Sequence, residues 1–424
     1  MIRFYNGRVL HFTHDGVDVR SEEVWTDGGR ICYVGPGKAS EKPFDRQIDL
    51  RGDLLMPGFK NAHTHTAASF FRSMADDLPL HQWLNERVFP NEKKLNDEAI
   101  YYFSLLGILE YVSSGITASF DMYFFNDSYV KANIDAGFRT VICSAMNDFD
   151  ADPTNIEREF LKFNNVNPLI GYRLGIHAEY TTSMERMEYM ASLARKHHAP
   201  AYAHISETRS EVEDCIRRYG LTPPQLLDKL GMFDYGGGGF HCIWFTDEDM
   251  ELFARKKLWA VTCPASNLKL ASGIAPICKS VKKGMQWAVG TDGAGSNNAL
   301  DMFREMYLVT ALQKYLENDA AACDANDVLK MACINGSYAM GLEDADGVEV
   351  GKLADLTVIS LNAPNMQPLH NISKNVVYSG SKQNVRLTMV NGKILYEDGE
   401  YFVGETPENI YRNVQRCITE NGMK

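Results

Sequence analysis

Cysteine pairs with the spacing of a metal site or a disulfide framework are missing from this sequence. The chain has nine cysteines, which is an odd number, and no two of them have the CxxC spacing. They lie far apart, at Cys32, Cys143, Cys215, Cys242, Cys263, Cys278, Cys323, Cys333 and Cys417. This usage argues against a disulfide scaffold and against a zinc site made of thiolates, and it is typical of a reducing compartment.

Long hydrophobic runs and an excess of positive charge are also absent. No apolar run reaches the ~18 residues that a membrane-spanning helix needs. The first residues, MIRFYNGRVLHF, alternate between apolar and polar and do not resemble a signal peptide. We therefore expect a cytoplasmic protein with no membrane partner. Because 55 acidic residues outnumber 43 basic ones, for a net charge of −12, a nucleic-acid polymer is a poor candidate partner and a small molecule is a better one.

Hydrophobic residues are plentiful, and they recur as short runs separated by amphipathic stretches. The 424 residues, 45% of them hydrophobic, are enough to bury a large core. The eight runs occupy residues 54–65, 116–124, 139–146, 169–180, 200–207, 238–245, 259–266 and 286–296. The stretch 183–198 between two of them has the apolar spacing of a helix. Eight strands that alternate with helices predict an α/β fold, a closed (β/α)8 barrel of the TIM type.

The two ends of the chain predict antiparallel β-structure instead. Short alternating segments occur at both ends, and Asn391-Gly392 and Asp398-Gly399 are hairpin signals. Thr406-Pro407 opens an amphipathic stretch that predicts a C-terminal helix. The expected division is a composite β-sandwich of residues 1–56 and 347–404, a catalytic barrel of residues 57–346 and a helix within residues 405–424.

The most informative residues for function lie at the ends of predicted barrel strands. His63 and His65 are two positions apart at the end of the first strand, so both imidazoles leave the same face and can bind one ion. His204, His241 and Asp292 come at the ends of the fifth, sixth and eighth strands. Each alone has a simpler explanation, as a core histidine, a loop hydrogen bond or a helix cap. Together they point into one mouth, because barrel active sites lie at the carboxyl ends of the strands.

Five sequence segments closely resemble the amidohydrolase superfamily. They are PGFKNAHTH (57–65), ADDLPLHQWL (75–84), HISET (204–208), SNLKLASG (266–273) and GTDGAGSNN (290–298). The most similar branch is that of the S-adenosylhomocysteine/5′-methylthioadenosine deaminases, with chlorohydrolase-like relatives. The resemblance extends over essentially the whole chain, including the divided sandwich.

The resemblance implies one divalent metal ion, bound by His63, His65, His204 and Asp292. Three imidazoles and a carboxylate suit zinc, with iron as the competitor. Relatives with two ions bridge them with a lysine on the fourth strand, and the run 169–180 has no lysine.

The family also implies how protons move. It assigns general acid/base catalysis to Glu207, orientation of the attacking hydroxide to His241, and help with proton removal to Asp292. The simpler explanation for Glu207 is a solvent-facing carboxylate in the first turn of a helix.

Substrate contacts follow from the same resemblance. Glu92 would accept hydrogen bonds from ribose hydroxyls, His177 would contact the nucleoside, and Trp83 would form an apolar wall. Trp83 could instead be a core anchor, and Glu92 an exposed loop charge.

The chain departs from the family at two points. Ser144 and Ala145 stand where many members have the arginine that meets the homocysteine carboxylate, and the common His-Ser-Pro-Tyr is His-Ala-Glu-Tyr at 177–180. Arg158 or Arg173 could take the place of the missing arginine. Without one, a 5′-thioether, 5′-deoxy or free adenosine fits at least as well as S-adenosylhomocysteine.

The predicted function is metal-dependent hydrolytic deamination of an adenosine-type nucleoside to the inosine analogue and ammonia. The candidate substrates are 5′-methylthioadenosine, S-adenosylhomocysteine, 5′-deoxyadenosine and adenosine. One alternative is an aminohydrolase or chlorohydrolase for another N-heterocycle, such as guanine, a pterin or a triazine. Another is a barrel that has lost catalysis. Relatives commonly form dimers or tetramers, so we expect a homo-oligomer.

Overall fold

The structure, a computed structural model, describes residues 1–14, 16–74, 76–78, 82–123, 126–149 and 155–423. Ala75, Pro79, Leu80 and His81 of the second family segment lie outside the described residues, and so does Phe124 of the second hydrophobic run.

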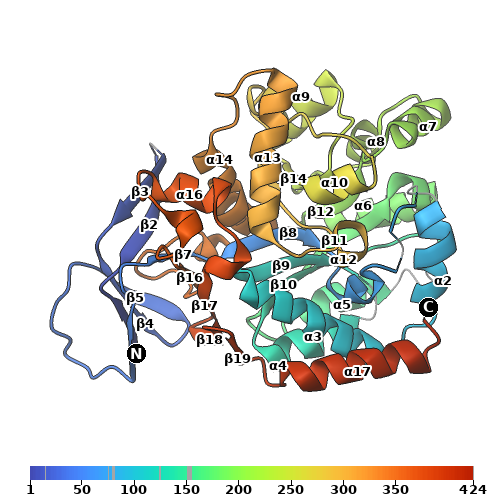
Figure 1. The fold of residues 1–424 in the computed structure, drawn as a ribbon. Coiled ribbons are helices and arrows are strands. Elements are labelled where there is room, and N and C mark those ends of the chain that lie inside the picture. The colour runs from blue at the N-terminus through green and yellow to red at the C-terminus, as the bar shows by residue number, and fades with distance from the viewer. Residues whose placement is uncertain (15, 75, 79–81, 124–125, 150–154, 424) are drawn as a thin grey trace.

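Eight parallel strands form the barrel at the centre of the molecule (Figure 1). They are β8 (Phe59–Thr64), β9 (Ile116–Met122), β10 (Arg139–Cys143), β11 (Ile170–Ala178), β12 (Ala201–Ile205), β13 (Gly237–His241), β14 (Trp259–Thr262) and β15 (Gln286–Val289). Seven of the predicted runs contain one of these strands, and the run 238–245 contains all of β13 but its first residue, so the predicted barrel is confirmed. All but a few of their residues are buried, as expected for parallel strands covered on both faces.

The barrel closes between its last strand and its first through residues just beyond β15. The backbone N–H groups of Thr291 and Asp292 both donate to the carbonyl of His63, at 3.1 and 2.9 Å. The Asn61 amide adds two bonds, donating to Thr291 Oγ1 at 2.7 Å and accepting from Thr291 N at 2.8 Å. This closure places Asp292 directly beside the His63-Thr64-His65 segment.

Helices surround the barrel and join its strands. The α-helices are α2 (Phe89–Glu92), α3 (Asp97–Ser113), α4 (Asn126–Ala136), α5 (Asn155–Phe163), α6 (Met184–His197), α7 (Arg209–Tyr219), α8 (Pro223–Lys229), α9 (Asp247–Lys256), α10 (Pro264–Lys269), α11 (Ile277–Val281), α12 (Ala294–Asn297), α13 (Met302–Glu317), α14 (Ala325–Lys330) and α15 (Gly336–Met340). Short 3₁₀ or π turns are η1 (Thr66–Phe71), η2 (Trp83–Val88), η3 (Glu179–Thr181), η4 (Met331–Asn335) and η5 (Glu343–Ala345). The predicted helix at 183–198 is α6, whose buried residues include the predicted apolar stripe.

Several of these helices begin at residues that satisfy their free N–H groups. Asn96 caps α3 through its side chain, and Thr208 and Thr246 form capping boxes at α7 and α9. Such caps stabilise a helix by about 0.5–2 kcal/mol each. They also define where each loop at the carboxyl end of a strand stops.

Both ends of the chain contribute to two further sheets. The strands are β1 (Ile2–Tyr5), β2 (Arg8–Thr13), β3 (Gly16–Arg20), β4 (Glu23–Asp27), β5 (Arg30–Gly35), β6 (Arg46–Asp49), β7 (Leu54–Pro57), β16 (Leu356–Ile359), β17 (Val385–Val390), β18 (Lys393–Glu397) and β19 (Glu400–Tyr401). One sheet has the order β5-β4-β1-β6 and the other β19-β18-β17-β16-β7-β2-β3. Because β16 pairs with β7, the two ends of the chain meet within one sheet.

The core between these sheets contains residues from both ends. It joins Phe4, Val9 and Val24 to Leu356, Val358 and Leu387, among others. Both predicted hairpin turns occur, with positive φ at Asn391 and Asp398.

The expectation of purely antiparallel ends is wrong in two details. β1 pairs with β6 and β2 with β7 in parallel, because the long connections that separate them return each strand in the same direction. The segment after β16 also includes η6 (Pro364–Met366), α16 (Ile372–Tyr378) and η7 (Lys382–Asn384). In α16 the buried Val376 and Val377 lie on one face, and the Asn371 side chain caps the first turn.

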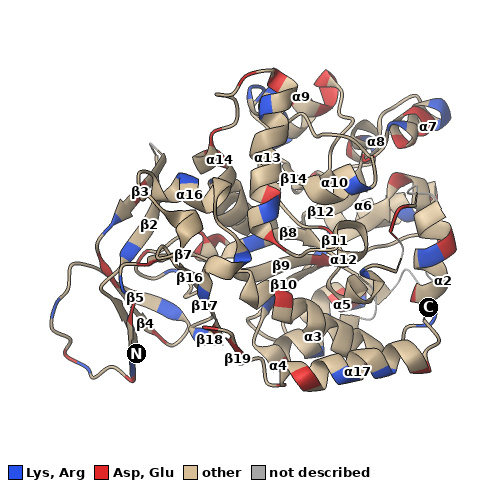
Figure 2. Ribbon diagram, viewed as in Figure 1, with Lys and Arg blue, Asp and Glu red and all other residues tan. Residues whose placement is uncertain are grey.

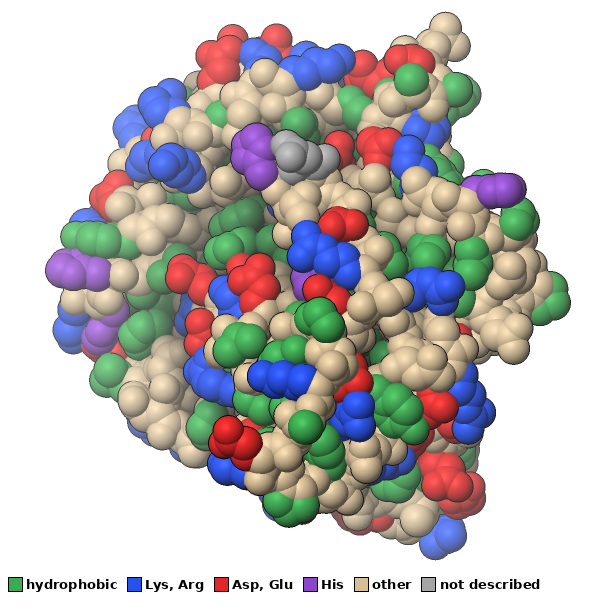
Figure 3. All heavy atoms as spheres, turned by 90° about the vertical axis from the view of Figure 1, so that its left-hand side faces the viewer, with side chains coloured by type: hydrophobic (Ala, Val, Ile, Leu, Met, Phe, Trp, Pro, Cys, Tyr) green, Lys and Arg blue, Asp and Glu red, His purple; other side chains and the backbone are tan. Residues whose placement is uncertain are grey.

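The last helix, α17 (Pro407–Glu420), follows Thr406, whose side chain accepts from Asn409 N, and it runs along α3 (Figure 1). Within the described part of the chain, no helix has both the length and the apolar character needed to cross a membrane. Positively and negatively charged residues are interspersed along the helices in Figure 2, and their side chains are interspersed over the sandwich end of the molecule in Figure 3.

Candidate active site

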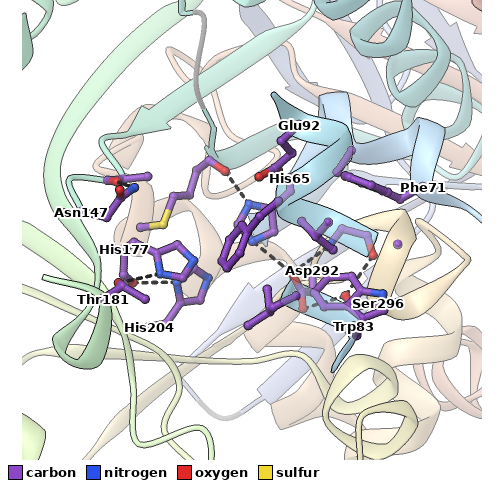
Figure 4. A pocket seen from close by; sticks show the side chains of 18 of the residues that line it. His65, Phe71, Trp83, Glu92, Asn147, His177, Thr181, His204, Asp292 and Ser296 are labelled. Atoms are coloured by element: carbon purple, nitrogen blue, oxygen red, sulfur yellow. Dashed lines mark hydrogen bonds and ion pairs between the residues drawn. The ribbon is translucent and has the colours of Figure 1, made fainter. Parts of the chain in front are cut away.

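A cavity of about 740 Å³ opens at the carboxyl ends of the barrel strands. Eight of the nine predicted site residues line it, and the ninth, His63, is fully buried behind them. The eight are His65, Trp83, Glu92, His177, His204, Glu207, His241 and Asp292. In Figure 4, His65 and Asp292 face each other, while Glu92 and Trp83 lie on the wall. The structure thus brings residues from seven elements, or from the turns directly after them, into one site.

Ligand atoms of two overlapping groups come close enough to share a metal ion. His63, His65 and Asp292 form one group, and His63, His204 and His241 form the other. His63 Nε2 lies 3.1 Å from His204 Nε2 and 3.7 Å from Asp292 Oδ1, and His65 Nε2 lies 3.3 Å from the same oxygen. His241, for which a role in orienting hydroxide is predicted, therefore also belongs to one of the two groups.

The hydrogen bonds behind the cluster determine which ring nitrogens face it as acceptors. His204 Nδ1 donates to the carbonyl of His177 at 2.7 Å, and His65 Nδ1 donates to the carbonyl of Met122. Because a carbonyl only accepts, Nε2 is the nitrogen that points into the cluster, and it carries the lone pair whenever the ring is neutral.

The remaining ring, His63, has an Nδ1 that is buried and has no hydrogen-bond partner within the described residues. A proton on one of these ring nitrogens can be shared with only one neighbour, whereas a single metal cation can bind the lone pairs of all of them. The residues present therefore fit a divalent ion.

Asp292 is oriented by its backbone and by three donors. Its φ of 59° lies in the left-handed region, which turns the chain sharply after β15. Oδ2 accepts from Ser266 Oγ at 2.5 Å and from Ser296 Oγ at 2.8 Å, and Oδ1 accepts from Gly293 N at 2.7 Å. The two serine hydroxyls donate to Oδ2, so Oδ1, which also accepts from Gly293 N, is the oxygen that faces the histidines.

Burial and mutual attraction act together on the ionisation of this cluster. Burial lowers the pKa values of His63 and His204 well below 6.5, which keeps both rings neutral. Burial also opposes charge on His65 and Asp292, but their hydrogen bond and mutual attraction prevail. They raise the pKa of His65 to about 9 and hold the pKa of Asp292 well below 3.8.

Glu207 and His241 face each other beside the cluster. Glu207 follows β12 after Ser206, whose φ of 52° turns the chain, and its Oε1 accepts from Ser272 Oγ at 3.1 Å. Its Oε2 lies 4.0 Å from His241 Nε2. His241 Nδ1 donates to Asn267 Oδ1 at 2.8 Å, so Nε2 of the neutral ring is an acceptor. Glu207 is buried and lines the cavity, which contradicts the solvent-facing alternative.

The three predicted substrate contacts lie on the walls of the cavity. Trp83 begins η2, and a side chain at Gly295 would meet its ring at 3.2 Å. His177 Nδ1 is 3.0 Å from Thr181 Oγ1, and burial lowers the pKa of His177 to about 4. Glu92 ends α2, and its charge acts on the buried hydroxyl of Tyr123. Burial, followed by the charge of Glu92, raises the pKa of Tyr123 well above 10.

The two arginines considered as partners for a substrate carboxylate do not line the cavity. Arg173 is buried against Met340, to whose carbonyl it donates at 2.8 Å, and Arg158 is exposed on α5. Ala145 does line the cavity, while the Ser144 hydroxyl donates a hydrogen bond to the carbonyl of Gly175 at 2.8 Å. The structure therefore rules out both arginines as substitutes in this conformation.

Sequence reasoning missed the residues that orient the site. They are Tyr123, Ser266, Asn267, Ser272 and Ser296. Four of them belong to the family segments 266–273 and 290–298, which was the available signal, but the side chains that Ser266, Asn267 and Ser272 contact are 26 or more residues away in the chain.

The fold and this cluster define the protein as a (β/α)8-barrel enzyme with a metal-competent site at the carboxyl ends of its strands. The chain belongs to the amidohydrolase family, whose model matches residues 54–395.

Individual relatives match nearly the whole chain. A 5-methylthioadenosine/S-adenosylhomocysteine deaminase of Pyrococcus furiosus is 36% identical over 403 residues, which cover 93% of this chain and 95% of that protein. A 5′-deoxyadenosine deaminase of Methanothermobacter thermautotrophicus is 38% identical over 402 residues, which cover 92% and 93%.

Solved structures agree with the fold. An adenosine deaminase from Xanthomonas campestris with bound zinc has a TM-score of 0.93 and 30% identity, covering 100% of this chain and 99% of that one. A triazine hydrolase variant has a TM-score of 0.90, covering 98% and 99%, and at 20% identity it shows the fold alone.

Proposed function

We propose that this enzyme hydrolyses the exocyclic amine of an adenosine-type nucleoside, producing the inosine analogue and ammonia. The candidate substrates remain 5′-methylthioadenosine, S-adenosylhomocysteine, 5′-deoxyadenosine and adenosine. The observation that carries the proposal is that one cavity joins the His/Asp cluster to a buried carboxylic acid, Glu207. The names of the relatives, which describe deaminases of this nucleoside class, support it.

We assign one divalent ion, zinc with iron as the competitor, to His63, His65, His204 and Asp292. Three inward-facing ring nitrogens and one carboxylate oxygen make the donor set. Such an ion supplies Lewis acidity that lowers the pKa of a water molecule from 15.7 to about 7. Zinc in the structure of the Xanthomonas campestris enzyme supports this assignment.

The remaining roles concern protons. As water adds to the amine-bearing ring carbon, Asp292 accepts a proton from the water and Glu207 delivers one to the neighbouring ring nitrogen. Asp292 then gives its proton to the amine, which leaves as ammonia, and Glu207 takes the proton of the new hydroxyl as the carbonyl forms, so both carboxyl groups return to their starting states. His241 Nε2, an acceptor beside Glu207, orients the attacking water through a hydrogen bond. Both carboxyl groups in these assignments belong to residues that line the cavity.

Recognition of the nucleoside falls to the outer wall. The Glu92 carboxylate, whose charge acts on the nearby Tyr123 hydroxyl, would accept hydrogen bonds from the ribose hydroxyls. His177 would contact the nucleoside, and the Trp83 ring would cover one face of it. A volume of about 740 Å³ accommodates a nucleoside with a short substituent.

We further propose that the enzyme prefers an uncharged 5′ group. Among the described residues that line the cavity, Lys93 is the only lysine or arginine, and it is exposed. The undescribed residues 15, 75, 79–81, 124–125 and 150–154 contain neither residue type, and Lys424 is the one undescribed lysine. Phe89 and Phe149, whose ring centroids are 5.5 Å apart, line the cavity and favour an apolar substituent.

A panel of substrates tests the proposal. Zinc-loaded enzyme is mixed with 5′-methylthioadenosine, 5′-deoxyadenosine, adenosine, S-adenosylhomocysteine, guanine and a triazine, and ammonia and UV spectra are followed. We expect turnover of nucleosides, with kcat/KM for 5′-methylthioadenosine above that for S-adenosylhomocysteine by about tenfold or more, the worth of one charge-assisted hydrogen bond. No turnover of any nucleoside would contradict the function. Equal use of both thioethers would contradict only the preference.

The organisation of the protein adds three further proposals. Residues 57–346 would form the catalytic unit, residues 1–56 with 347–404 the sandwich, and the helix within 405–424 an appendage. We also propose a cytoplasmic location, from the reduced cysteines, and assembly into a homo-oligomer, which sedimentation of the purified protein would test.

A further inference from the structure

One short segment contacts the two residues that the proposed reaction uses for proton transfer, Asp292 and Glu207, and also His241, which orients the water. It comprises α10 and the turn that follows it, residues 264–272, and we call it the support segment. It contains most of the SNLKLASG segment, to which the proposed reaction assigns no role. Its three hydrogen bonds run from Ser266 Oγ to Asp292 Oδ2 at 2.5 Å, from His241 Nδ1 to Asn267 Oδ1 at 2.8 Å, and from Ser272 Oγ to Glu207 Oε1 at 3.1 Å.

The three contacting side chains of the support segment are themselves buried. Ser266 is 0% exposed, Asn267 1% and Ser272 5%. A buried hydroxyl or amide that loses its partner has no water to replace it, so each side chain is held to its acceptor or donor. These contacts therefore restrict Asp292, His241 and Glu207 more than surface hydrogen bonds would.

Other elements fasten the support segment at both ends. At its start, Glu305 on α13 accepts from the backbone N–H of Ala265 at 3.0 Å. At its end, Trp244 Nε1 donates to the carbonyl of Ser272 at 2.8 Å. Because the segment is held at both ends, it can keep three side chains at the ends of three different strands in fixed positions.

At Glu207 the support segment acts on the side chain alone. The backbone of this region is held separately by Glu211, whose carboxylate accepts from Ser206 N at 2.7 Å and from Glu207 N at 2.8 Å. Ser272 occupies Oε1, and Oε2 remains the oxygen nearer to His241. The two oxygens of the carboxylate are therefore not equivalent.

We propose that Ser266, Asn267 and Ser272 are positioning residues. They hold the side chains of Asp292, His241 and Glu207 at fixed positions relative to one another. Ser272 selects Oε2 as the oxygen of Glu207 that carries the proton. The inference rests on the proposed function for the roles of Asp292, His241 and Glu207.

The first test removes the contact to Glu207. Ser272→Ala should lower kcat by about 10- to 100-fold, the usual effect of losing an orienting partner, with little change in KM. Ser272→Thr, which keeps the hydroxyl, should restore most of kcat. The matched control is Ser280→Ala, because Ser280 is another buried serine, with hydrogen bonds to Ile277 and Trp287 and none to the site.

The test compares the kcat and the thermal stability of Ser272→Ala with those of Ser280→Ala. A fall in kcat in Ser272→Ala that exceeds the fall in Ser280→Ala, at similar thermal stability, supports positioning. Equal kcat values in the two variants, or a loss explained by unfolded protein, would overturn the proposal for Ser272.

The second test needs no substrate. Ser266→Ala removes one of the two hydroxyls that occupy Asp292 Oδ2, so Zn²⁺ affinity, measured by competition with a chelator, should fall by about tenfold or more relative to Ser280→Ala. Unchanged affinity would overturn the role of Ser266. If wild-type enzyme deaminates no nucleoside, the proposed function fails while this measurement still decides whether the support segment orients Asp292.

Discussion

Glu207 differs from every other acidic residue that lines the cavity, because it is buried beside His241 while remaining outside the metal-competent cluster. Glu207→Gln should therefore lower kcat by about 10²- to 10⁴-fold, the usual contribution of a general acid or base, and leave bound zinc unchanged. Steady-state kinetics together with metal analysis measures both quantities. Glu213→Gln, an exposed position on α7, is the control. Near-normal turnover in Glu207→Gln would require another proton carrier.

Asp292 should respond differently to the same kind of change. In Asp292→Asn the amide can no longer offer a charged oxygen to His65 and His63. Zinc affinity should then fall by more than the ~10–100-fold expected for an outer partner, and kcat should fall with it. Chelator competition and kinetics at saturating zinc separate the two effects. If saturating zinc restores full activity, Asp292 has no part in proton removal.

At the scale of single elements, strand β8 carries a buried charge as well as two histidines. Lys60 Nζ donates to the carbonyl of Gly58 at 2.8 Å and to Thr117 Oγ1 at 2.9 Å, which joins β8 to β9. Burial lowers the pKa of Lys60 to about 8, partly offset by the charge of Asp355. Between pH 8 and the usual value near 10.4, the unfolded chain binds this proton more strongly than the folded one.

The sign of the resulting pH dependence follows from this difference in pKa. The contribution of Lys60 to stability rises as pH rises through this window and is lost as pH falls through 8. It amounts to about 3 kcal/mol at most. Urea unfolding of the wild type and of Lys60→Met at pH 7 and pH 10 measures it. The wild type should gain stability relative to the variant at pH 10, and parallel behaviour of the two would contradict the assignment.

At the scale of the whole molecule, a buried ion pair links the barrel to the C-terminal strands. Arg139 at the start of β10 donates to Asp355 at 2.6 and 3.2 Å, and their side chains are 4% and 0% exposed. Asp355→Ala would leave the buried guanidinium with the carbonyl of Pro168, at 3.1 Å, but without its charged partner, which should destabilise the protein by about 3–5 kcal/mol.

Because this pair lies far from the cavity lining, kcat per folded molecule should not change. Asp344→Ala is the control, since its pair with Arg30 is half-exposed and worth about 1 kcal/mol or less. Thermal unfolding and active-site titration provide the comparison. Equal destabilisation in the two variants would show that Arg139 finds another partner.

Much of this architecture could be predicted from local patterns. The eight barrel strands were predictable because parallel strands covered on both faces form continuous apolar runs, and α6 because its apolar stripe has helical spacing. The parallel pairs β1–β6 and β2–β7 were not, because pairing between strands leaves no mark on the composition of either strand.

The sequence by itself determined the fold class, the family and the nine candidate site residues, because spacing along a strand and short motifs are local properties. Only the tertiary structure decided what holds those residues in place. Ser266, Asn267 and Ser272 come from one segment, yet their partners are 26, 26 and 65 residues away. It also decided that Arg158 and Arg173 are absent from the cavity wall. Hydrogen bonds and burial depend on the closed barrel, and the order of residues alone does not specify them.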